Sequence, residues 1–286
     1  MNKFFLLLIL SATLSAQTIH SSLSTYFENK TFTNSVQKED GVVYGFGADI
    51  HYGGSEFKVT YEQAKTNTIG QTNIKKGDLE IKKLYMRYAY NFDKKFALNI
   101  NYLSVLEDNI APTDGGFAFG GGMTYTFNRT VALNFTQYYT EYEDFDIFQT
   151  DFRVDYKMKV DKVKLKFSSI TKFISVEDDD AVEHYTDNAQ NTYLTTGVKF
   201  HAHAKGYHLG LGAYFGKRAF AIMDDGFKLQ HHALEFDRTY AVGIGKNLYD
   251  FVLRGQYVYQ RAVELPVNND QNVKVSVYRV VANYKF

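Results

Sequence analysis

The chain of 286 residues contains no cysteine, only two prolines and no excess of charge of either sign. Without a thiol it forms no disulfide scaffold, carries no lipid-modified cysteine and offers no thiolate to a metal ion. Its 32 Lys and Arg balance 32 Asp and Glu, so the charge does not favour nucleic acid as a partner. The one long apolar run, Phe4–Leu10, is far shorter than the roughly 20 residues of a membrane-spanning helix. A helical membrane protein is therefore not expected.

The first 16 residues have the features of an export signal. Lys3 supplies a positive charge, Phe4–Leu10 an apolar core, and Ala16 a small residue before a cleavage point. We expect residues 17–286 to form one domain, because no linker or change of composition divides them. The sequence also has 23 Tyr and 24 Phe but a mean hydropathy of −0.32, as expected of strands with one face in lipid and one in water.

Apolar and polar residues alternate along most of the chain, and the C-terminal segment is the clearest case. Tyr278, Val280, Ala282, Tyr284 and Phe286 share one face of an extended strand, whereas Arg279, Asn283 and Lys285 lie on the other. With its terminal Phe, this pattern resembles the Gram-negative outer-membrane β-barrel proteins. The resemblance implies that Tyr284 and Phe286 are read by the barrel-assembly machinery. It also implies that lipid and lipopolysaccharide of the cell outer membrane surround the protein.

The number of alternating segments predicts a transmembrane antiparallel up-and-down β-barrel of about 14 strands, the first near 19–27. Tight turns are expected near 53–54, 93–95, 128–129, 159–161, 205–206 and 247. Longer polar segments, at 28–40, 66–78, 107–115, 177–190, 220–229 and 262–271, alternate with them. Short periplasmic turns and longer outside loops are typical of bacterial barrels, so both chain ends are expected in the periplasm. In length and strand count the chain is similar to the monomeric fourteen-stranded porins, and a monomer is favoured.

The faces assigned to the bore are largely small or polar, with glycines such as Gly45, Gly120, Gly197 and Gly210 expected to leave room for water. A basic patch is predicted on three neighbouring strands near the periplasmic end, made by Lys162, Lys164, Lys166, Lys199, His201, His203 and His208. Such a patch would favour anions weakly. Alternatively, the acidic lining residues Asp151 and Asp155 neutralise it. A bore filled by apolar side chains would argue against permeation altogether.

These features predict a passive channel for small hydrophilic solutes, with no cofactor, no metal and no catalytic residue. The histidines at 201, 203 and 208 could ligate a metal, but no carboxylate at a fixed spacing completes the set. An acidic run near 177–187 could hold divalent cations between lipopolysaccharide phosphates.

Other classes remain open. A barrel protease or phospholipase would need groups such as His231, His232, Glu235 and Asp237, or His184 and Asp187. An adhesin or structural barrel is a further alternative. A transporter of apolar solutes is disfavoured, because strand one is expected to begin too near the mature N-terminus to leave a plugging segment.

Overall fold

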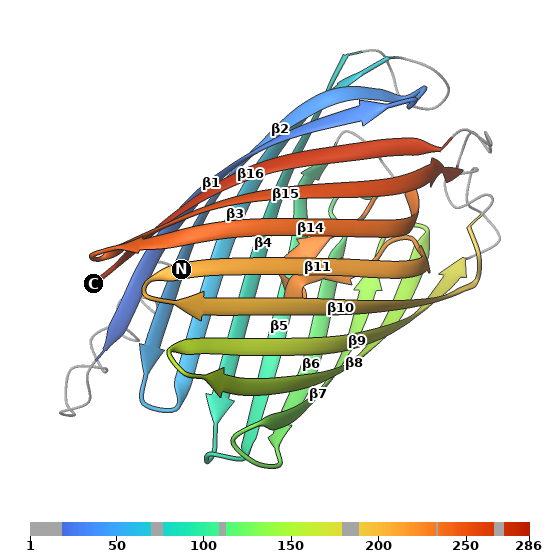
Figure 1. Cartoon of the computed structure of the whole chain (residues 1–286). Helices are drawn as coiled ribbons and strands as arrows, with labels where there is room; N and C mark the ends of the chain where they lie inside the picture. The colour runs from blue at the N-terminus through green and yellow to red at the C-terminus, as the bar shows by residue number, and fades with distance from the viewer. Residues whose placement is uncertain (1–18, 70–76, 109–112, 179–188, 233, 266–271) are drawn as a thin grey trace, which may run out of the picture.

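A computed structural model describes residues 19–69, 77–108, 113–178, 189–232, 234–265 and 272–286. The expected leader, 1–16, lies outside them. Fourteen long strands of this described part close into an antiparallel barrel (Figure 1). Their bounds are β1 His20–Thr33, β2 Lys38–Tyr52, β3 Ser55–Thr68, β4 Gly77–Asn91, β5 Phe96–Asp108, β6 Phe117–Thr126, β7 Val131–Glu141, β8 Phe145–Val160, β9 Val163–Asp178, β10 Thr192–Ala204, β11 Tyr207–Arg218, β14 Leu234–Leu248, β15 Phe251–Glu264 and β16 Val273–Lys285.

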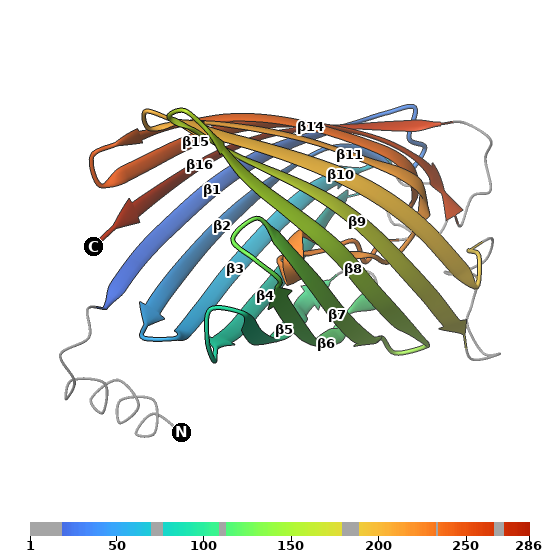
Figure 2. The same cartoon turned by 60° about the horizontal axis from the view of Figure 1, so that its bottom comes forward.

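The barrel closes between its first and last strands. Strand β1 pairs with β16 over a register that runs from Ser22↔Lys285 to Thr33↔Lys274. Because the strand number is even, both ends of the described barrel lie at one rim, the rim of the short turns (Figure 2). The prediction of a fourteen-stranded antiparallel barrel is confirmed. No helix among the described residues is long and apolar enough to span a membrane.

Two of the short turns share a local cause. The Asp93 carboxylate accepts hydrogen bonds from the N–H groups of Lys95 and Phe96, at 2.6 and 2.8 Å. The Asn128 side chain does the same for Thr130 and Val131, at 2.8 and 2.9 Å. Short Asp and Asn side chains stabilise tight turns in this way, which explains why β4–β5 and β6–β7 reverse where they do.

The large apolar side chains assigned to lipid point outward. Tyr44, Phe46 and Ile50 of β2 are 51%, 62% and 45% exposed, whereas Val43, directly before Tyr44 in sequence, is 1% exposed. Aromatic pairs lie on the outer surface at the short-turn rim, among them Tyr90–Phe92, Tyr125–Phe127 and Tyr284–Phe286. An apolar outer band with aromatic residues near its edge is the surface that a bilayer requires.

Two boundaries differ from the sequence-based expectation. Strand β1 continues to Thr33, and the connection to β2 is only 34–37 rather than 28–40, because the backbones of β1 and β2 stay paired as far as Thr31↔Asp40. The long segment expected at 220–229 is not simply an outside loop. It belongs to a stretch between β11 and β14 that enters the barrel.

Candidate functional site

Residues 219–232, here called the inward segment, fold into the bore (Figures 1 and 2, orange, between β11 and β14). They form a small hairpin of β12 (Ile222–Met223) and β13 (Lys228–Leu229), joined by a short 3-10 turn, η3 (Asp224–Gly226). Backbone φ is positive at the three turn positions, 52° at Asp224, 58° at Asp225 and 93° at Gly226. This left-handed run makes the reversal tight enough to fit inside the barrel.

The hairpin spans the bore. Around the barrel β5 is six strands from β11 and seven from β14, so it lies on the opposite wall. The turn nevertheless contacts β5: a Cβ added to Gly226 would be 3.0 Å from Oδ1 of Asn101. A residue with a side chain at 226 would therefore have to displace this wall contact as well as adopt a strained φ.

Polar side chains of the wall hold the base of the hairpin. Gln149 of β8 donates from Nε2 to the Ile222 carbonyl at 2.7 Å and accepts the Ile222 N–H at 2.8 Å. Lys172 of β9 donates to the same carbonyl at 2.9 Å. Gln149 is 1% exposed and Ile222 is fully buried, so these bonds replace the strand pairing that the hairpin edge lacks.

Ion pairs hold the tip. Lys199 of β10 lies 3.0 Å from Asp224, and Arg153 of β8 contacts Asp225. The Lys199 ammonium holds the pKa of Asp224 well below its usual range. Partial desolvation inside the barrel opposes the same effect at Asp225, but Arg153 outweighs it and lowers that pKa too. Both carboxylates therefore stay ionised, and the tip remains charge-paired at neutral pH.

The long-loop half of the bore is an apolar core, contrary to the sequence-based expectation of a wet interior. Phe220 and Ile222 are fully buried, and Leu229 is 3% exposed. They belong to two clusters of inward-facing residues: Ile147, Ile170, Ile174, Tyr193 and Phe220 in one, and Val43, Ile81, Leu103, Val105, Ile222 and Leu229 in the other. The hairpin supplies apolar surface from the centre, so wall residues that would line an open pore are covered instead.

Several inward glycines also behave differently from the expectation. A Cβ on Gly45, Gly120 or Gly197 would overlap the ring of Tyr26, Tyr138 or Tyr214, at 2.1, 2.3 and 2.4 Å. Each glycine accommodates a tyrosine from the neighbouring strand and leaves no free space there. Gly210 and Gly212 differ, because the nearest atoms to an added Cβ are 3.5 and 3.8 Å away.

The open space of the barrel lies beside these uncovered glycines. A cavity of about 1080 Å³ extends from residues at the short-turn rim to Met223, Asp224, Lys228 and Gln230 of the inward segment. Of the described residues that line it, nine are Lys or Arg and two are carboxylic acids. These are Arg129, Lys157, Lys159, Lys164, Lys166, Lys199, Lys228, Arg254 and Arg279, with Glu28 and Asp224. Both acids are already paired, Asp224 with Lys199 and Glu28 with Arg279.

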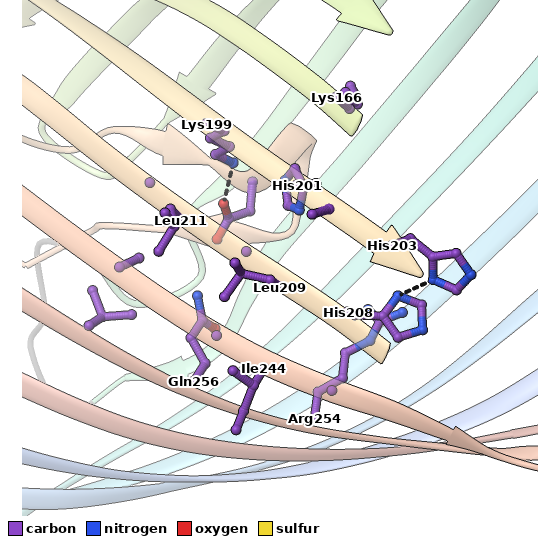
Figure 3. Close-up of a pocket in the computed structure, with 18 of the residues that line it drawn as sticks. Lys166, Lys199, His201, His203, His208, Leu209, Leu211, Ile244, Arg254 and Gln256 are labelled. Atoms are coloured by element: carbon purple, nitrogen blue, oxygen red, sulfur yellow. Dashed lines mark hydrogen bonds and ion pairs between the residues drawn. The ribbon is translucent and has the colours of Figure 1, made fainter. Parts of the chain in front are cut away.

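Strand register brings most of the predicted basic patch together around this cavity (Figure 3). His203 lies opposite Lys164 on β9 and His208 on β11, and His201 lies opposite Lys166. The Nδ1 atoms of His203 and His208 are 3.1 Å apart. Lys162 is the exception: it is exposed in the turn between β8 and β9 and is not a lining residue.

The two predicted acidic residues have separate partners. Asp155 lies 3.1 Å from Lys166 and accepts a hydrogen bond from Ser168 at 2.7 Å. Asp151 pairs with Lys172, nearer the hairpin. The acids therefore offset only part of the patch. Sequence analysis missed Arg153, Lys172, Lys228, Arg254 and Arg279. The same alternation that assigned Asp151 and Asp155 to the bore could have found Arg153.

The three patch histidines are not grouped with a carboxylate as a ligand cluster. In the described part of the chain, clusters of three possible metal ligands lie elsewhere, at Asp108–His231–His232 and at Asp49–His51–Glu56. The other rim groups considered for catalysis are engaged in ion pairs, Glu235 with Lys217 at 2.8 Å and Asp237 with Arg261. His184 and Asp187 lie outside the described residues, as does most of the acidic run at 177–187.

The terminal aromatic residues sit where an assembly signal would be accessible. Phe286 is 62% exposed, its N–H donates to the Ser21 carbonyl at 2.9 Å, and its ring packs edge-on against Tyr284. The backbone bond fixes the last residue beside β1, at the barrel seam. Recognition of Tyr284 and Phe286 by the assembly machinery stays a prediction.

No protein-family model and no curated protein matches the chain. Among solved structures it is similar to the CymD monoaromatic hydrocarbon channel, with a TM-score of 0.56 and 9% identity over 96% of this chain and 91% of that one. A bacterial polysaccharide outer membrane secretin gives a TM-score of 0.53 and 8% identity, covering 94% and 98%. Pseudomonas aeruginosa OccK8 (OprE) gives 0.48 and 12%, covering 95% and 98%. At such identities the similarity shows the fold alone, a closed antiparallel β-barrel.

Proposed function

We propose that this protein is an outer-membrane channel for small hydrophilic solutes, with a preference for anions and with the inward segment as its restriction. The observation that carries the proposal is the cavity, which nine Lys and Arg line against two acids. Three of the nine, Lys166, Lys199 and Arg279, are in ion pairs, and the other six leave the lining positively charged. Neither a cofactor nor catalytic chemistry is needed for this role.

Electrostatics supports the anion preference. The cationic side chains lie within a narrow cavity surrounded by protein and, in a membrane, by hydrocarbon, so their field is screened less than at an open surface. Arg254 shows the arrangement well. It lines the cavity from β15 and lies over Gly245 of β14, where an added Cβ would be 2.7 Å from its Cγ.

The hairpin would set how much current passes. It reaches the far wall at Asn101, and its base is packed in apolar side chains, so solutes must pass its charged tip or wait for it to move. The exposed side chains of Asp224 and Asp225, 48% and 57%, border the space that stays wet. Passage beside them would be slow and selective compared with an open barrel of this strand number.

The cellular setting belongs to the same proposal. The apolar outer face fits outer-membrane lipid and lipopolysaccharide, and the leader at 1–16 would direct export before cleavage near Ala16. The short-turn rim, with both barrel ends, would then face the periplasm, and a monomer is the favoured state. The comparison structures include an outer-membrane channel, the CymD monoaromatic hydrocarbon channel.

The test is the reversal potential of the purified barrel in a planar bilayer under a KCl gradient. The wild type should prefer chloride, and Arg254→Glu should shift the potential toward the cation side, because it removes one positive charge and adds a negative one inside the cavity. Lys162→Glu makes the same charge change in the exposed turn and should shift it far less. Cation preference of the wild type would overturn the selectivity, and absence of any conductance would overturn the channel.

A further inference from the structure

Two histidines of the inward segment and one aspartate of the wall converge at the long-loop end of the barrel. Nε2 of His231 lies 3.1 Å from Oδ2 of Asp108, and Nε2 of His232 lies 3.5 Å from the same oxygen. The three ligand atoms all lie within 4.8 Å of one another. His231 and Asp108 are buried, and His232 is largely so.

The backbone is shaped to bring the two rings together. Consecutive side chains of an extended strand point to opposite faces, yet the rings of His231 and His232 have centroids 4.1 Å apart. Between β13 and β14 the chain leaves the strand conformation at these residues, which makes the shared direction possible. The supporting contacts also fit a metal site: the Thr113 hydroxyl donates to Asp108 Oδ2 at 2.8 Å, and Nδ1 of His231 lies 3.4 Å from the Leu229 carbonyl.

The spacing suits a tetrahedral ion. Zinc binds His nitrogen and carboxylate oxygen at about 2.0–2.1 Å, which puts neighbouring ligand atoms roughly 3.4 Å apart in a tetrahedron. The two Nε2–Oδ2 separations, 3.1 and 3.5 Å, bracket that value. The 3.1 Å separation also fits an N–H···O hydrogen bond, whereas 3.5 Å is too long for a normal one. The geometry points to a zinc site formed by Asp108, His231 and His232.

Lys38 opposes this ion and gives the proposal a sharp test. Its Nζ lies 3.1 Å from Nδ1 of His232. An ammonium group can only donate, so in this arrangement Nδ1 accepts and Nε2 carries the proton. Zinc must displace that proton and move it to Nδ1, where Lys38 cannot receive a hydrogen bond. Replacing the lysine by glutamine supplies an acceptor and removes the nearby positive charge.

The site would act as a clasp. Asp108 ends β5, on the wall opposite the two strands from which the inward segment emerges, and the histidines end that segment. An ion bound to all three would tie the segment to the far wall and oppose its withdrawal from the bore. This role is independent of anion selectivity, which depends on the cavity at the other end.

The experiment measures zinc on the full mature barrel refolded in detergent, stripped with chelator and titrated with ZnCl₂. Bound metal is quantified by mass spectrometry, and Co²⁺ replaces Zn²⁺ to give an absorption spectrum that reports tetrahedral coordination. Variants are Asp108→Asn, His232→Gln and Lys38→Gln. His203→Gln removes a histidine from the cavity and serves as the matched control. Heat-modifiable mobility on a gel verifies that each variant is folded.

We expect one zinc per wild-type barrel, and at least about tenfold weaker binding in Asp108→Asn and His232→Gln. His203→Gln should bind like the wild type, and Lys38→Gln about tenfold more tightly. The proposal is overturned if folded wild type binds no zinc, if it binds equally well without Asp108 or His232, or if the cavity control loses the ion. Channel current is measured on the same samples, so failure of zinc binding is distinguishable from failure of conduction.

Discussion

Replacement of Gln149 by alanine should release the inward segment without removing any charge. Gln149 makes two hydrogen bonds to the Ile222 backbone, at 2.7 and 2.8 Å, in a fully buried environment. The Ile222 carbonyl keeps Lys172 as a donor at 2.9 Å, but its N–H loses its partner. A buried donor left unsatisfied costs about 1–3 kcal/mol, and the second bond adds about 0.5–1.5 kcal/mol.

The combined effect, about 1.5–4.5 kcal/mol, would raise the population with the segment displaced by roughly 10- to 2000-fold. Single-channel recording should show this as longer or more frequent high-conductance intervals. Hydrogen exchange of the amides in 219–232 should become faster, while exchange in the β-strands stays the same.

Gln256→Ala is the matched control. Gln256 lines the cavity from β15. Among the described residues, no hydrogen bond or ion pair joins it to the inward segment. Its replacement should leave both measurements unchanged. If Gln149→Ala folds and yet matches this control in conductance and in exchange, the segment is not held as we infer.

Two further changes test packing and assembly. Gly120→Ala would place a methyl group 2.3 Å from the Tyr138 ring, so it should lower the unfolding free energy by about 1–3 kcal/mol in urea titration, whereas Gly121→Ala, with nothing within 4 Å, should cost much less. Equal stability of the two variants would contradict the proposed ring-over-glycine packing. Phe286→Ser should reduce the amount of folded barrel in the outer membrane, measured by heat-modifiable mobility. Phe127→Ser, which changes another exposed aromatic residue at the same rim, should not. Normal levels of the Phe286 variant would count against the assembly signal.

The fold was predictable because the two faces of each strand contact different surroundings, lipid outside and the bore inside. Tyr44 and Phe46 had to face away from the bore once Gly45 faced it, since the side-chain period of a strand is two. The same rule predicted that Lys166 and His201 both face the bore, and the strand register places them side by side. Local patterns were enough to predict the features that depend on one strand and its immediate neighbour, namely which face each side chain takes and which side chains lie beside one another.

The inward fold of residues 219–232 could not be predicted from local sequence patterns. The run Ala219–Met223 is apolar within a segment expected to be a polar loop, and this was the available signal. Its partners, however, are Gln149 and Asn101, which lie 73 and more than 100 positions away in sequence and on other walls. No spacing within the segment indicates those contacts, so whether the loop stays outside or folds inward is decided only by the closed barrel.

The base and the tip of the hairpin are held in the bore by different interactions. At the base of the hairpin, Phe220 and Ile222 are fully buried. Separating them from the wall would expose apolar area to water, and salt does not screen this hydrophobic cost. At the tip of the hairpin, Asp224 pairs with Lys199 and Asp225 with Arg153, and these exposed charge pairs are weaker and are screened by salt. Small displacements of the hairpin should therefore begin at the tip while the base stays seated. The charged tip also faces the basic cavity, so the part of the hairpin that moves most easily is the part that a permeating anion would meet.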